Sequence, residues 1–320
     1  MSKEIFISEN ISQKIPKFDS IIFDCDGVLV DIRNSYDHAI NKTISAIMKE
    51  LFNDEVDDIV TSKIHFGLKS VGGFNDEVAV VYAIVMTLAA SKKSKIEFEK
   101  LIIDVINNAN ESGINSIDEY FKVQNMDLSE IKSKLDYENS RKISYIHRIF
   151  NQLFYGPKLY EEIFNDKSQF NDEPLIDLDE IVLDDNLMTK LKTRFDSKIA
   201  TVTGRGKFAF SYSMKNFLEK FDIGSSVFLE DRPLDLAKPN PVSLIESISK
   251  INSKCSLYIG DSMEDLLMVQ KCQERGYDVS FCGIYGSSNE PKLKYELFQK
   301  NKASFILESI QELPKALNLV

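Results

Sequence analysis

Short apolar runs separated by helix-length segments form the first pattern along this chain. Each run is bounded by polar or turn-forming residues, and the runs cover residues 21–23, 199–202, 227–229, 257–259, 279–284 and 305–307. Runs that are apolar at consecutive positions are typical of strands buried on both faces of a parallel sheet. Their alternation with helical segments therefore predicts an α/β fold built on a parallel sheet.

Residues 32–186 show a different, helical pattern. Apolar residues recur at three-to-four-residue spacing over 39–52, and residues 145–154 suit a helix that ends at Gly156, before a proline. The apolar stretch 78–90 is shorter than the roughly 18 to 20 residues needed to cross a bilayer, so we expect a buried helix there. The pattern predicts a helical insertion.

The two patterns divide the chain into two domains. We place residues 1–31 and 187–320 in the α/β domain and residues 32–186 in the helical insertion. Within the insertion, residues 171–186 contain seven carboxylates and no Lys or Arg. A run of one charge is usually a solvated face, so we expect this stretch to be a surface return to the α/β domain.

Composition narrows the partners expected for this fold. The 320 residues carry a formal net charge of -11 and no long Lys/Arg cluster, which argues against nucleic acid because a phosphate backbone requires a basic stripe. The first residues lack the pattern of a signal peptide and no stretch is long enough to cross a membrane, so we expect a cytoplasmic protein. The oligomeric state stays open.

The cysteines form no Cys-x-x-Cys pair and are expected to be reduced and buried; they are Cys25, Cys255, Cys272 and Cys282.

The first apolar run leads into two carboxylates. Asp24 and Asp26 follow it, and Gly27 comes next. The period of two along a strand and the following turn place both carboxylates at the strand's carboxyl end, where α/β sheets bind ligands. A polar turn is the alternative. A calcium loop fails on spacing, because its fifth and twelfth positions fall on Val28 and Ser35.

Residues 24–31 resemble motif I of the haloacid dehalogenase superfamily, Asp-x-Asp-Gly-Val/Thr-Leu-Val/Phe-Asp, at every position. The superfamily requires a Ser or Thr, then a Lys, then an acidic pair further along the chain. The resemblance implies a Rossmann-like parallel-sheet core with an inserted α-helical cap domain of the C1 type, similar to subfamily IA. Matches to the remaining motifs follow later apolar runs.

The second apolar run ends in Thr203, followed by Gly204 and Arg205. A hydroxyl at a strand end is able to donate a hydrogen bond to a phosphoryl oxygen, although such a threonine is by itself more typical of a turn or helix cap. Its place in the series favours motif II. We expect Gly204 and Arg205 to contact an anionic substrate, with a solvated arginine as the alternative.

Lys238 lies in the turn Ala-Lys-Pro-Asn-Pro, which its prolines stiffen. An unattached surface lysine is the ordinary alternative. The setting resembles motif III, in which the ammonium contacts both the phosphoryl group and the nucleophilic carboxylate. A positive charge there holds together negative groups that otherwise repel one another.

Residues 260–265, Gly-Asp-Ser-Met-Glu-Asp, match motif IV directly after an apolar run. Asp261 is expected at the strand end and Asp265 one helical turn later on the same side, a spacing that lets both serve a single cation. A helix N-cap role for Asp261 or Ser262 is compatible with this prediction.

An oxygen-lined site predicts Mg²⁺ as the cofactor. By resemblance, Asp24, the backbone carbonyl of Asp26 and Asp261 ligate the ion, and Asp265 helps directly or through water. Oxygen ligands suit magnesium, whereas zinc is typically held by His and Cys clusters. The histidines are scattered and are expected to be structural or exposed; they are His38, His65 and His147.

The resemblance implies a phosphatase. Asp24 attacks phosphorus to form an aspartyl-phosphate, and Asp26 acts as general acid and then as general base. Magnesium, Lys238, Thr203 and backbone N–H groups near Asp26 and Gly27 counter the charge on the transferring group. Cleavage of a haloacid releases no alkoxide, so it needs no general acid such as Asp26. The presence of Asp26 and Gly27 therefore favours phosphate esters over haloacids, and the expected partner is a small phosphorylated metabolite.

The helical insertion is expected to act as a cap that selects the leaving group. Its segment 66–76 combines glycines with polar residues, and Lys69 and Asn75 are the candidates for substrate contact. An ordinary turn and helix cap is the alternative. Two other functions stay open: a phosphonate hydrolase that forms a Schiff base through Lys69, and a non-catalytic binding protein that retains the fold.

Overall fold

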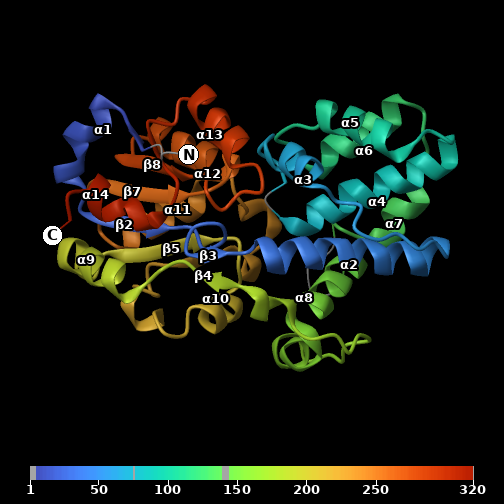
Figure 1. The fold of residues 1–320 in the computed structure, drawn as a ribbon, viewed down its shortest axis with the longest axis horizontal. Helices are drawn as coiled ribbons and strands as arrows, with labels where there is room; N and C mark the ends of the chain where they lie inside the picture. The colour runs from blue at the N-terminus through green and yellow to red at the C-terminus, as the bar shows by residue number, and fades with distance from the viewer. Residues whose placement is uncertain (1–4, 75, 139–143, 320) are drawn as a thin grey trace. The chain divides into compact units, whose positions relative to one another are not determined.

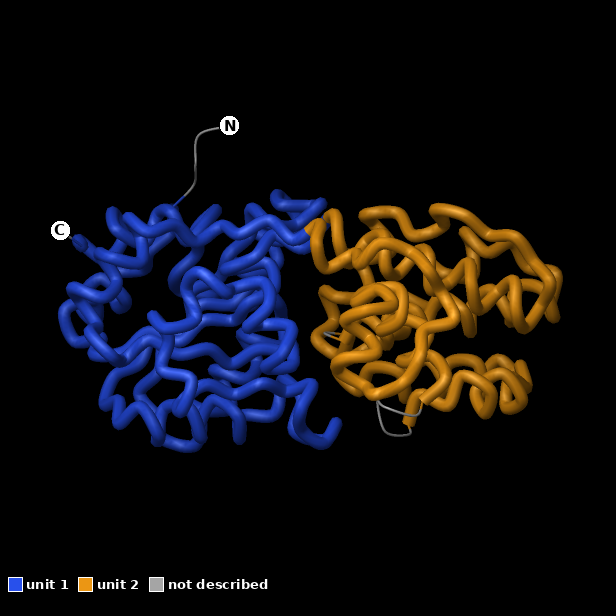
Figure 2. Tube along the Cα trace, turned by 90° about the horizontal axis from the view of Figure 1, so that it is seen from below, with its two compact units in different colours: residues 1–33, 179–320 blue, residues 34–178 orange. Residues whose placement is uncertain are grey.

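The computed structural model describes residues 5–74, 76–138 and 144–319. The chain separates into two compact units (Figure 2): unit 1 comprises Met1–Arg33 and Asp179–Val320, and unit 2 comprises Asn34–Leu178. The insertion therefore ends at residue 178 rather than at the predicted 186. The reason is that strand β4 (Glu180–Ile181) pairs with β3 (Val30–Asp31) within unit 1.

Unit 1 is built on a seven-stranded sheet with the order β1-β9-β8-β7-β2-β5-β6 (Figure 1). All neighbouring strands are parallel except β1 and β9. The strands are β1 (Phe6–Ile7), β2 (Ser20–Phe23), β5 (Ile199–Thr203), β6 (Val227–Phe228), β7 (Ser256–Gly260), β8 (Val279–Ile284) and β9 (Phe305–Leu307). The predicted parallel sheet is thus confirmed. Strand β1, which pairs antiparallel with β9 at the edge of the sheet, was not predicted.

Helices cover both faces of this sheet. Along β2, Ile21 and Phe23 belong to one core cluster and Ile22 to the other, as the alternation of side chains along a strand requires. The first cluster packs against α1 (Glu9–Lys14), α9 (Asp185–Phe195), α10 (Lys207–Ser213) and α14 (Leu313–Ala316). The second packs against α11 (Val242–Lys250), α12 (Met263–Glu274) and α13 (Pro291–Lys300). Burial on both faces explains why the strand runs are continuously apolar.

Unit 2 is helical in its described residues. Its helices are α2 (Arg33–Phe52, entering from unit 1), α3 (Ser62–Lys69), α4 (Glu77–Ser94), α5 (Phe98–Asn108), α6 (Ile114–Val123), α7 (Ser129–Leu135) and α8 (Tyr145–Phe164). Helix α4 is buried from Glu77 to Ala90, as predicted. Helix α8 breaks at Gly156 (φ 66°) as predicted but resumes directly, because Pro157 is tolerated at the start of the second segment.

The strand order of unit 1 reverses at β2. From β2 the chain proceeds to β5 and β6 on one side, and then to β7, β8 and β9 on the other. Ligands of open α/β sheets bind beyond the carboxyl ends of the strands at such a reversal. The two-stranded ribbon of β3 and β4 lies where the chain leaves and re-enters unit 1.

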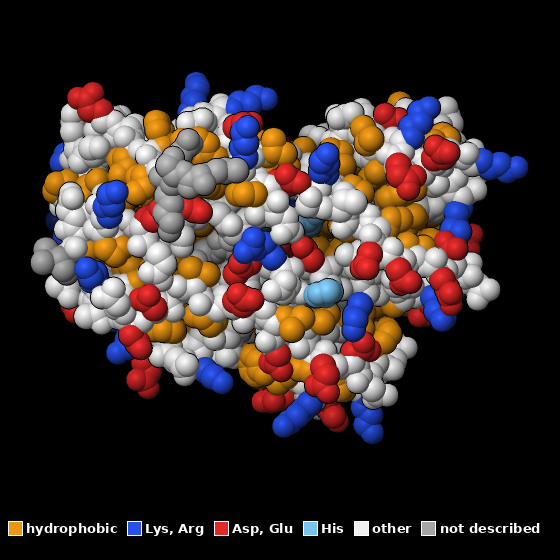
Figure 3. Space-filling view, viewed as in Figure 1, with side chains coloured by type: hydrophobic (Ala, Val, Ile, Leu, Met, Phe, Trp, Pro, Cys, Tyr) orange, Lys and Arg blue, Asp and Glu red, His pale blue; other side chains and the backbone are white. Residues whose placement is uncertain are grey.

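Charged side chains are mixed over the face shown in Figure 3, where Lys and Arg lie scattered among Asp and Glu. This distribution agrees with the overall charge of -11 and offers no basic stripe on the described part of that face. None of the described helices is both long and apolar enough to cross a membrane.

Candidate active site

Three sequence motifs meet at the carboxyl ends of adjacent strands. Asp24 follows β2, Thr203 ends β5 and Asp261 follows β7. Strand β2 pairs with both β5 and β7, so these residues lie side by side although more than half of the chain separates the first from the last. The site therefore forms at the reversal of strand order.

Asp24 is buried, with 4% of its surface exposed. Its backbone N–H donates to the carbonyl of Ile259 (2.8 Å), which ties it to β7. Its Oδ1 accepts the N–H of Cys25 (2.7 Å), and its Oδ2 lies 2.9 Å from the Lys238 ammonium. Both carboxylate oxygens are therefore oriented by the protein.

Lys238 joins two carboxylates. Its side chain is fully buried, and Nζ lies 2.9 Å from Asp24 Oδ2 and 2.8 Å from Asp265 Oδ1. The Tyr258 hydroxyl donates to the same Asp265 oxygen (2.8 Å), and Nζ lies 5.8 Å from the centre of the Tyr258 ring. Lys238 thus reduces the repulsion between two acids held close together.

Asp265 holds the turn that carries Asp261. Its Oδ2 accepts hydrogen bonds from the N–H groups of Asp261 and Ser262 (both 3.1 Å) and from the Ser262 hydroxyl (2.8 Å). The Ser262 hydroxyl also accepts the N–H of Asp265, which completes a capping box at the start of α12. The expected N-cap is therefore Ser262.

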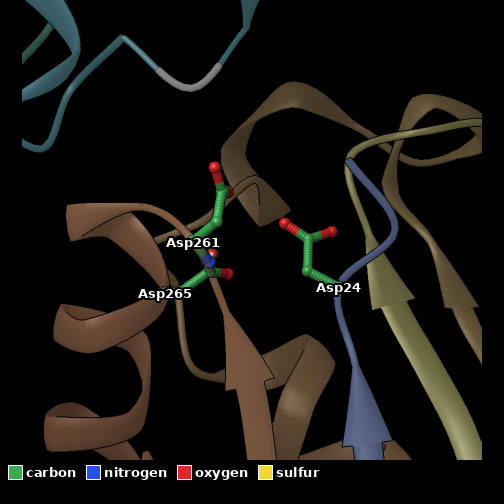
Figure 4. A group of neighbouring side chains, drawn as sticks. All are labelled: Asp24, Asp261 and Asp265. Atoms are coloured by element: carbon green, nitrogen blue, oxygen red, sulfur yellow. Dashed lines mark hydrogen bonds between the residues drawn. The ribbon is translucent and has the colours of Figure 1, made fainter. Parts of the chain in front are cut away.

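Asp24, Asp261 and Asp265 each offer a carboxylate oxygen, and these atoms all lie within 4.8 Å of one another. Figure 4 shows Asp24 at the end of β2, opposite Asp261 beyond β7, with Asp265 lower at the start of α12. Both oxygens of Asp265 accept protein hydrogen bonds, and Asp24 and Asp261 each have one oxygen beside a lysine ammonium. Hard oxygen donors in this number suit Mg²⁺.

Gly27 makes room for this group of acids. It has φ +70°, and a Cβ built on it would lie 2.2 Å from Asp261 Oδ2. Its N–H donates to the carbonyl of Val30 (2.8 Å) within the same loop. Substrate contact by backbone N–H groups near Asp26 and Gly27 stays a prediction. Only glycine satisfies both the dihedral angle and the close approach.

Helix α13 adds a second ammonium to the site. Lys294 Nζ lies 2.5 Å from Asp261 Oδ2, and 12% of its side chain is exposed. Nearby, the Ser287 hydroxyl donates to the carbonyl of Gly27 (2.5 Å). The segment after β8 therefore contacts both the loop that follows Asp24 and the turn that carries Asp261.

Residues 203–205, Thr-Gly-Arg, lie at the end of β5, on the opposite side of Asp24 from β7. Thr203 is buried and its Oγ1 accepts the N–H of Arg205 (3.2 Å). The carbonyl of Gly204 accepts the N–H of Glu230 (3.0 Å). Arg205 does not extend into solvent: its Nε donates to Asp26 Oδ1 (2.5 Å), and Nη1 donates to Asp179 Oδ2 (2.8 Å).

The pKa values of Asp24 and Asp265 shift in opposite directions. Burial raises the pKa of Asp24 to about 8, and the neighbouring carboxylates add to the shift, against the opposing effect of Lys238. Burial acts in the same direction on Asp265, but Lys238 and hydrogen bonds from Ser262 and Tyr258 bring its pKa below the usual value. The pKa of Lys238 is raised because the two carboxylates outweigh burial. A cation beside Asp24 favours its charged form.

In unit 2, the predicted substrate residue Lys69 forms an ion pair with Glu77, a buried residue at the start of α4. His65 Nε2 lies 3.4 Å from the same carboxylate. Lys69 and His65 together bring the pKa of Glu77 below its usual value, although burial raises it. Asn75 lies outside the described residues. Substrate contact by Lys69 or Asn75 stays a prediction.

Several residues of the site were not predicted from the sequence: Asp179, Tyr258, Ser287 and Lys294. Asp179 is part of the acidic stretch 171–186, and its side chain is only 4% exposed, so the expectation of a solvated stretch is wrong at this position. Tyr258 lies within the predicted strand of motif IV, and a polar atom in a buried strand was the available signal.

The fold is similar to solved structures of haloacid dehalogenase-like proteins. Phosphatase Tt82 from Thermococcus thioreducens is 22% identical, with a TM-score of 0.55, over 87% of this chain and 98% of that chain. A haloacid dehalogenase-like protein of unknown function, ATU0790 from Agrobacterium tumefaciens, is 14% identical, with a TM-score of 0.51, over 94% of this chain and 98% of that chain. No protein-family model and no curated protein matches the sequence.

Proposed function

We propose that this chain, whose fold is that of the haloacid dehalogenase-like hydrolases, is a magnesium-dependent phosphomonoester hydrolase acting on a small phosphorylated metabolite. The observation that supports it is the contact of Lys238 with Asp24 and Asp265 (2.9 and 2.8 Å) at the carboxyl end of β2. In this arrangement the Asp24 carboxylate would face an anionic substrate, and the Lys238 ammonium would reduce the repulsion between the carboxylate and the substrate.

Asp24 is the proposed nucleophile. One of its oxygens attacks phosphorus, a bond forms between Asp24 and the phosphoryl group, and the bond to the leaving oxygen breaks. Lys238 offsets charge on the transferring group, and the Thr203 hydroxyl donates a hydrogen bond to a phosphoryl oxygen. Asp24 and Asp261, with help from the carbonyl of Asp26, would hold Mg²⁺, which would supply further charge stabilisation.

Asp26 is the proposed general acid and general base. Its carboxyl group gives a proton to the departing alkoxide, and its carboxylate then takes a proton from the water that attacks the aspartyl-phosphate. Hydrolysis releases phosphate and restores Asp24. The contact of Asp26 Oδ1 with Arg205 Nε (2.5 Å) supports a defined orientation for this carboxyl group.

Asp265 is assigned a structural part in this proposal. Its oxygens accept bonds from Ser262, Tyr258 and the Asp261 N–H, and one of them pairs with Lys238. We therefore propose that it fixes Lys238 and the Asp261 turn, and that Asp24 and Asp261 are the side-chain ligands of the ion. The Schiff-base alternative is less favoured, because Lys69 is engaged by Glu77.

The experiment is turnover of p-nitrophenyl phosphate with Mg²⁺ by the wild type and by Asp24→Asn. We expect the variant to lose at least about 10³-fold in kcat, because the attacking carboxylate is gone. Asp185→Asn is the control, since Asp185 is an exposed acid of the same unit. Equal activity of the wild type and Asp24→Asn contradicts the proposal. An absence of turnover across a panel of phosphomonoesters supports the binding-protein alternative instead. If the wild type is active, a phosphate-release screen of metabolites identifies the leaving group.

A further inference from the structure

A buried ion network lies beside Asp26, and the reaction scheme above assigns no task to most of it. Arg205 is 2% exposed, and the side chain of Asp179 is 4% exposed. Buried charges are stable only when they are paired and hydrogen-bonded. The network is therefore part of the buried interior of unit 1 and is not a surface ion pair.

The guanidinium of Arg205 is fixed from two sides. Nε donates to Asp26 Oδ1 at 2.5 Å, while Nη1 donates to Asp179 Oδ2 and to the Ser213 hydroxyl, both at 2.8 Å. The Ser213 hydroxyl in turn donates to Asp179 Oδ2 at 2.9 Å. Because the guanidinium is planar and rigid, fixing one edge with Asp179 fixes the direction of the Nε–H bond toward Asp26.

The network also joins segments far apart in sequence. Asp179 begins the part of unit 1 that follows the helical insertion, directly before β4. Strand β4 pairs with β3, and the N–H of Val182 donates to the carbonyl of Leu29 at 2.8 Å, within the loop that carries Asp26. The backbone ribbon and the two ion pairs of Arg205 thus join Asp179 to the loop that carries Asp26.

We propose that Arg205 and Asp179 are positioning residues for Asp26. Asp179 orients Arg205, and Arg205 holds the Asp26 carboxylate in the one direction from which it serves the leaving oxygen. This replaces the substrate-binding part predicted for Arg205, because its Nε and Nη1 atoms already contact protein carboxylates. The inference rests on the proposed phosphatase function.

The leaving group distinguishes this role from a purely structural one. p-Nitrophenolate departs without protonation, whereas an alkoxide requires a proton from Asp26. We expect Asp179→Ala and Arg205→Lys to lower kcat/KM for an alkyl phosphomonoester such as glycerol 1-phosphate about 10²-fold, since general acid–base catalysis contributes about that much. For p-nitrophenyl phosphate the loss in kcat/KM should stay below about tenfold, because kcat/KM includes only the steps up to departure of the leaving group and not hydrolysis of the aspartyl-phosphate, in which Asp26 acts for both esters.

A second readout uses Asp26→Asn. If Arg205 acts through Asp26, adding Arg205→Lys to Asp26→Asn lowers kcat no further. Asp185→Asn, in the same acidic stretch, is the control and leaves both substrates unaffected. Ser213→Ala, which removes only the hydroxyl between Arg205 and Asp179, carries the test if the charge variants do not fold, with a smaller loss and the same dependence on leaving group.

An equal loss of kcat/KM for both esters, or no loss for either, overturns the inference. So does an additive loss in the double variant. These outcomes leave the proposed function intact as long as Asp24→Asn is inactive. If Asp24→Asn is as active as the wild type, the proposed function itself fails.

Discussion

The ammonium of Lys294 lies 2.5 Å from Oδ2 of Asp261, one of the two carboxylates that we propose as ligands of the ion. An ammonium and a divalent cation are attracted to the same oxygen and repel each other. Lys294 therefore competes with the cation that unit 1 is proposed to bind.

Lys294→Met is expected to bind Mg²⁺ about tenfold more tightly than the wild type, which corresponds to ~1.4 kcal/mol. The measurement is titration calorimetry with Mg²⁺ at constant ionic strength. Lys292→Met, an exposed lysine of the same helix, is the control and should change the affinity little. Unchanged or weaker binding by Lys294→Met would show that the contact with Asp261 does not oppose the cation.

Lys238→Met should destabilise unit 1. The lysine is fully buried between Asp24 and Asp265, so its loss leaves two buried acids without their counter-charge. Breaking such a pair costs about 3–5 kcal/mol of unfolding free energy. We expect this loss in urea denaturation with EDTA, and a partial recovery with Mg²⁺, which replaces the positive charge beside Asp24.

The matched control for Lys238→Met is Lys254→Met, an exposed lysine of unit 1. Its unfolding midpoint should stay close to that of the wild type in both buffers. A Lys238→Met protein with the wild-type midpoint in EDTA would contradict the view that this lysine compensates two buried carboxylates.

Gly27→Ala tests the close approach of the loop that follows Asp24 to Asp261. The added Cβ would lie 2.2 Å from Asp261 Oδ2, so the carboxylate must move. A displacement of about 1 Å in a catalytic group costs about 10²-fold in rate, and we expect a loss of that size in kcat with weaker Mg²⁺ binding.

Gly276→Ala separates this clash from backbone strain. Gly276 also has positive φ (+85°), but a Cβ added there would meet nothing within 4 Å. Its substitution should cost stability through the dihedral angle alone and leave the kcat of the folded protein unchanged. Similar losses of kcat in the two variants would place the effect in the backbone rather than at Asp261.

Asp19 gives unit 1 a pH-dependent share of its stability. Burial raises its pKa, but hydrogen bonds from Ser253 and from the N–H groups of Lys254 and Cys255 outweigh burial, and its pKa falls from 3.8 to about 2. Because the folded value lies below the unfolded one, the contribution is complete above about pH 4 and is lost as pH falls toward 2.

Asp19→Asn should therefore be less stable than the wild type at pH 6, and the difference should shrink as pH falls from 4 to 2. Denaturation midpoints measured across this range provide the test. Asp278→Asn, a half-exposed acid that pairs with Lys14, serves as the control. A difference in denaturation midpoint between Asp19→Asn and the wild type that is the same at every pH would show that Asp19 does not make stability depend on pH.

Local sequence was sufficient to identify the sheet and the residues at its carboxyl ends. Buried parallel strands are continuously apolar, so the polar residues that interrupt them are visible without a structure, as Asp24, Thr203 and Asp261 were. Their order along the chain identified the resemblance to a known superfamily. The helical pattern of the insertion was equally local, because helical periodicity depends on neighbouring residues.

Only the tertiary structure decided which charges meet. Asp179 lies in an acidic stretch typical of solvent-exposed chain, yet folding places it against Arg205, and Lys294 meets Asp261 from a helix 33 positions away in sequence. The sequence suggested that Arg205 contacts substrate, whereas in the fold it contacts Asp26 and Asp179. Ion pairs of this kind depend on distance in space and on burial, and neither quantity has a local pattern in the sequence.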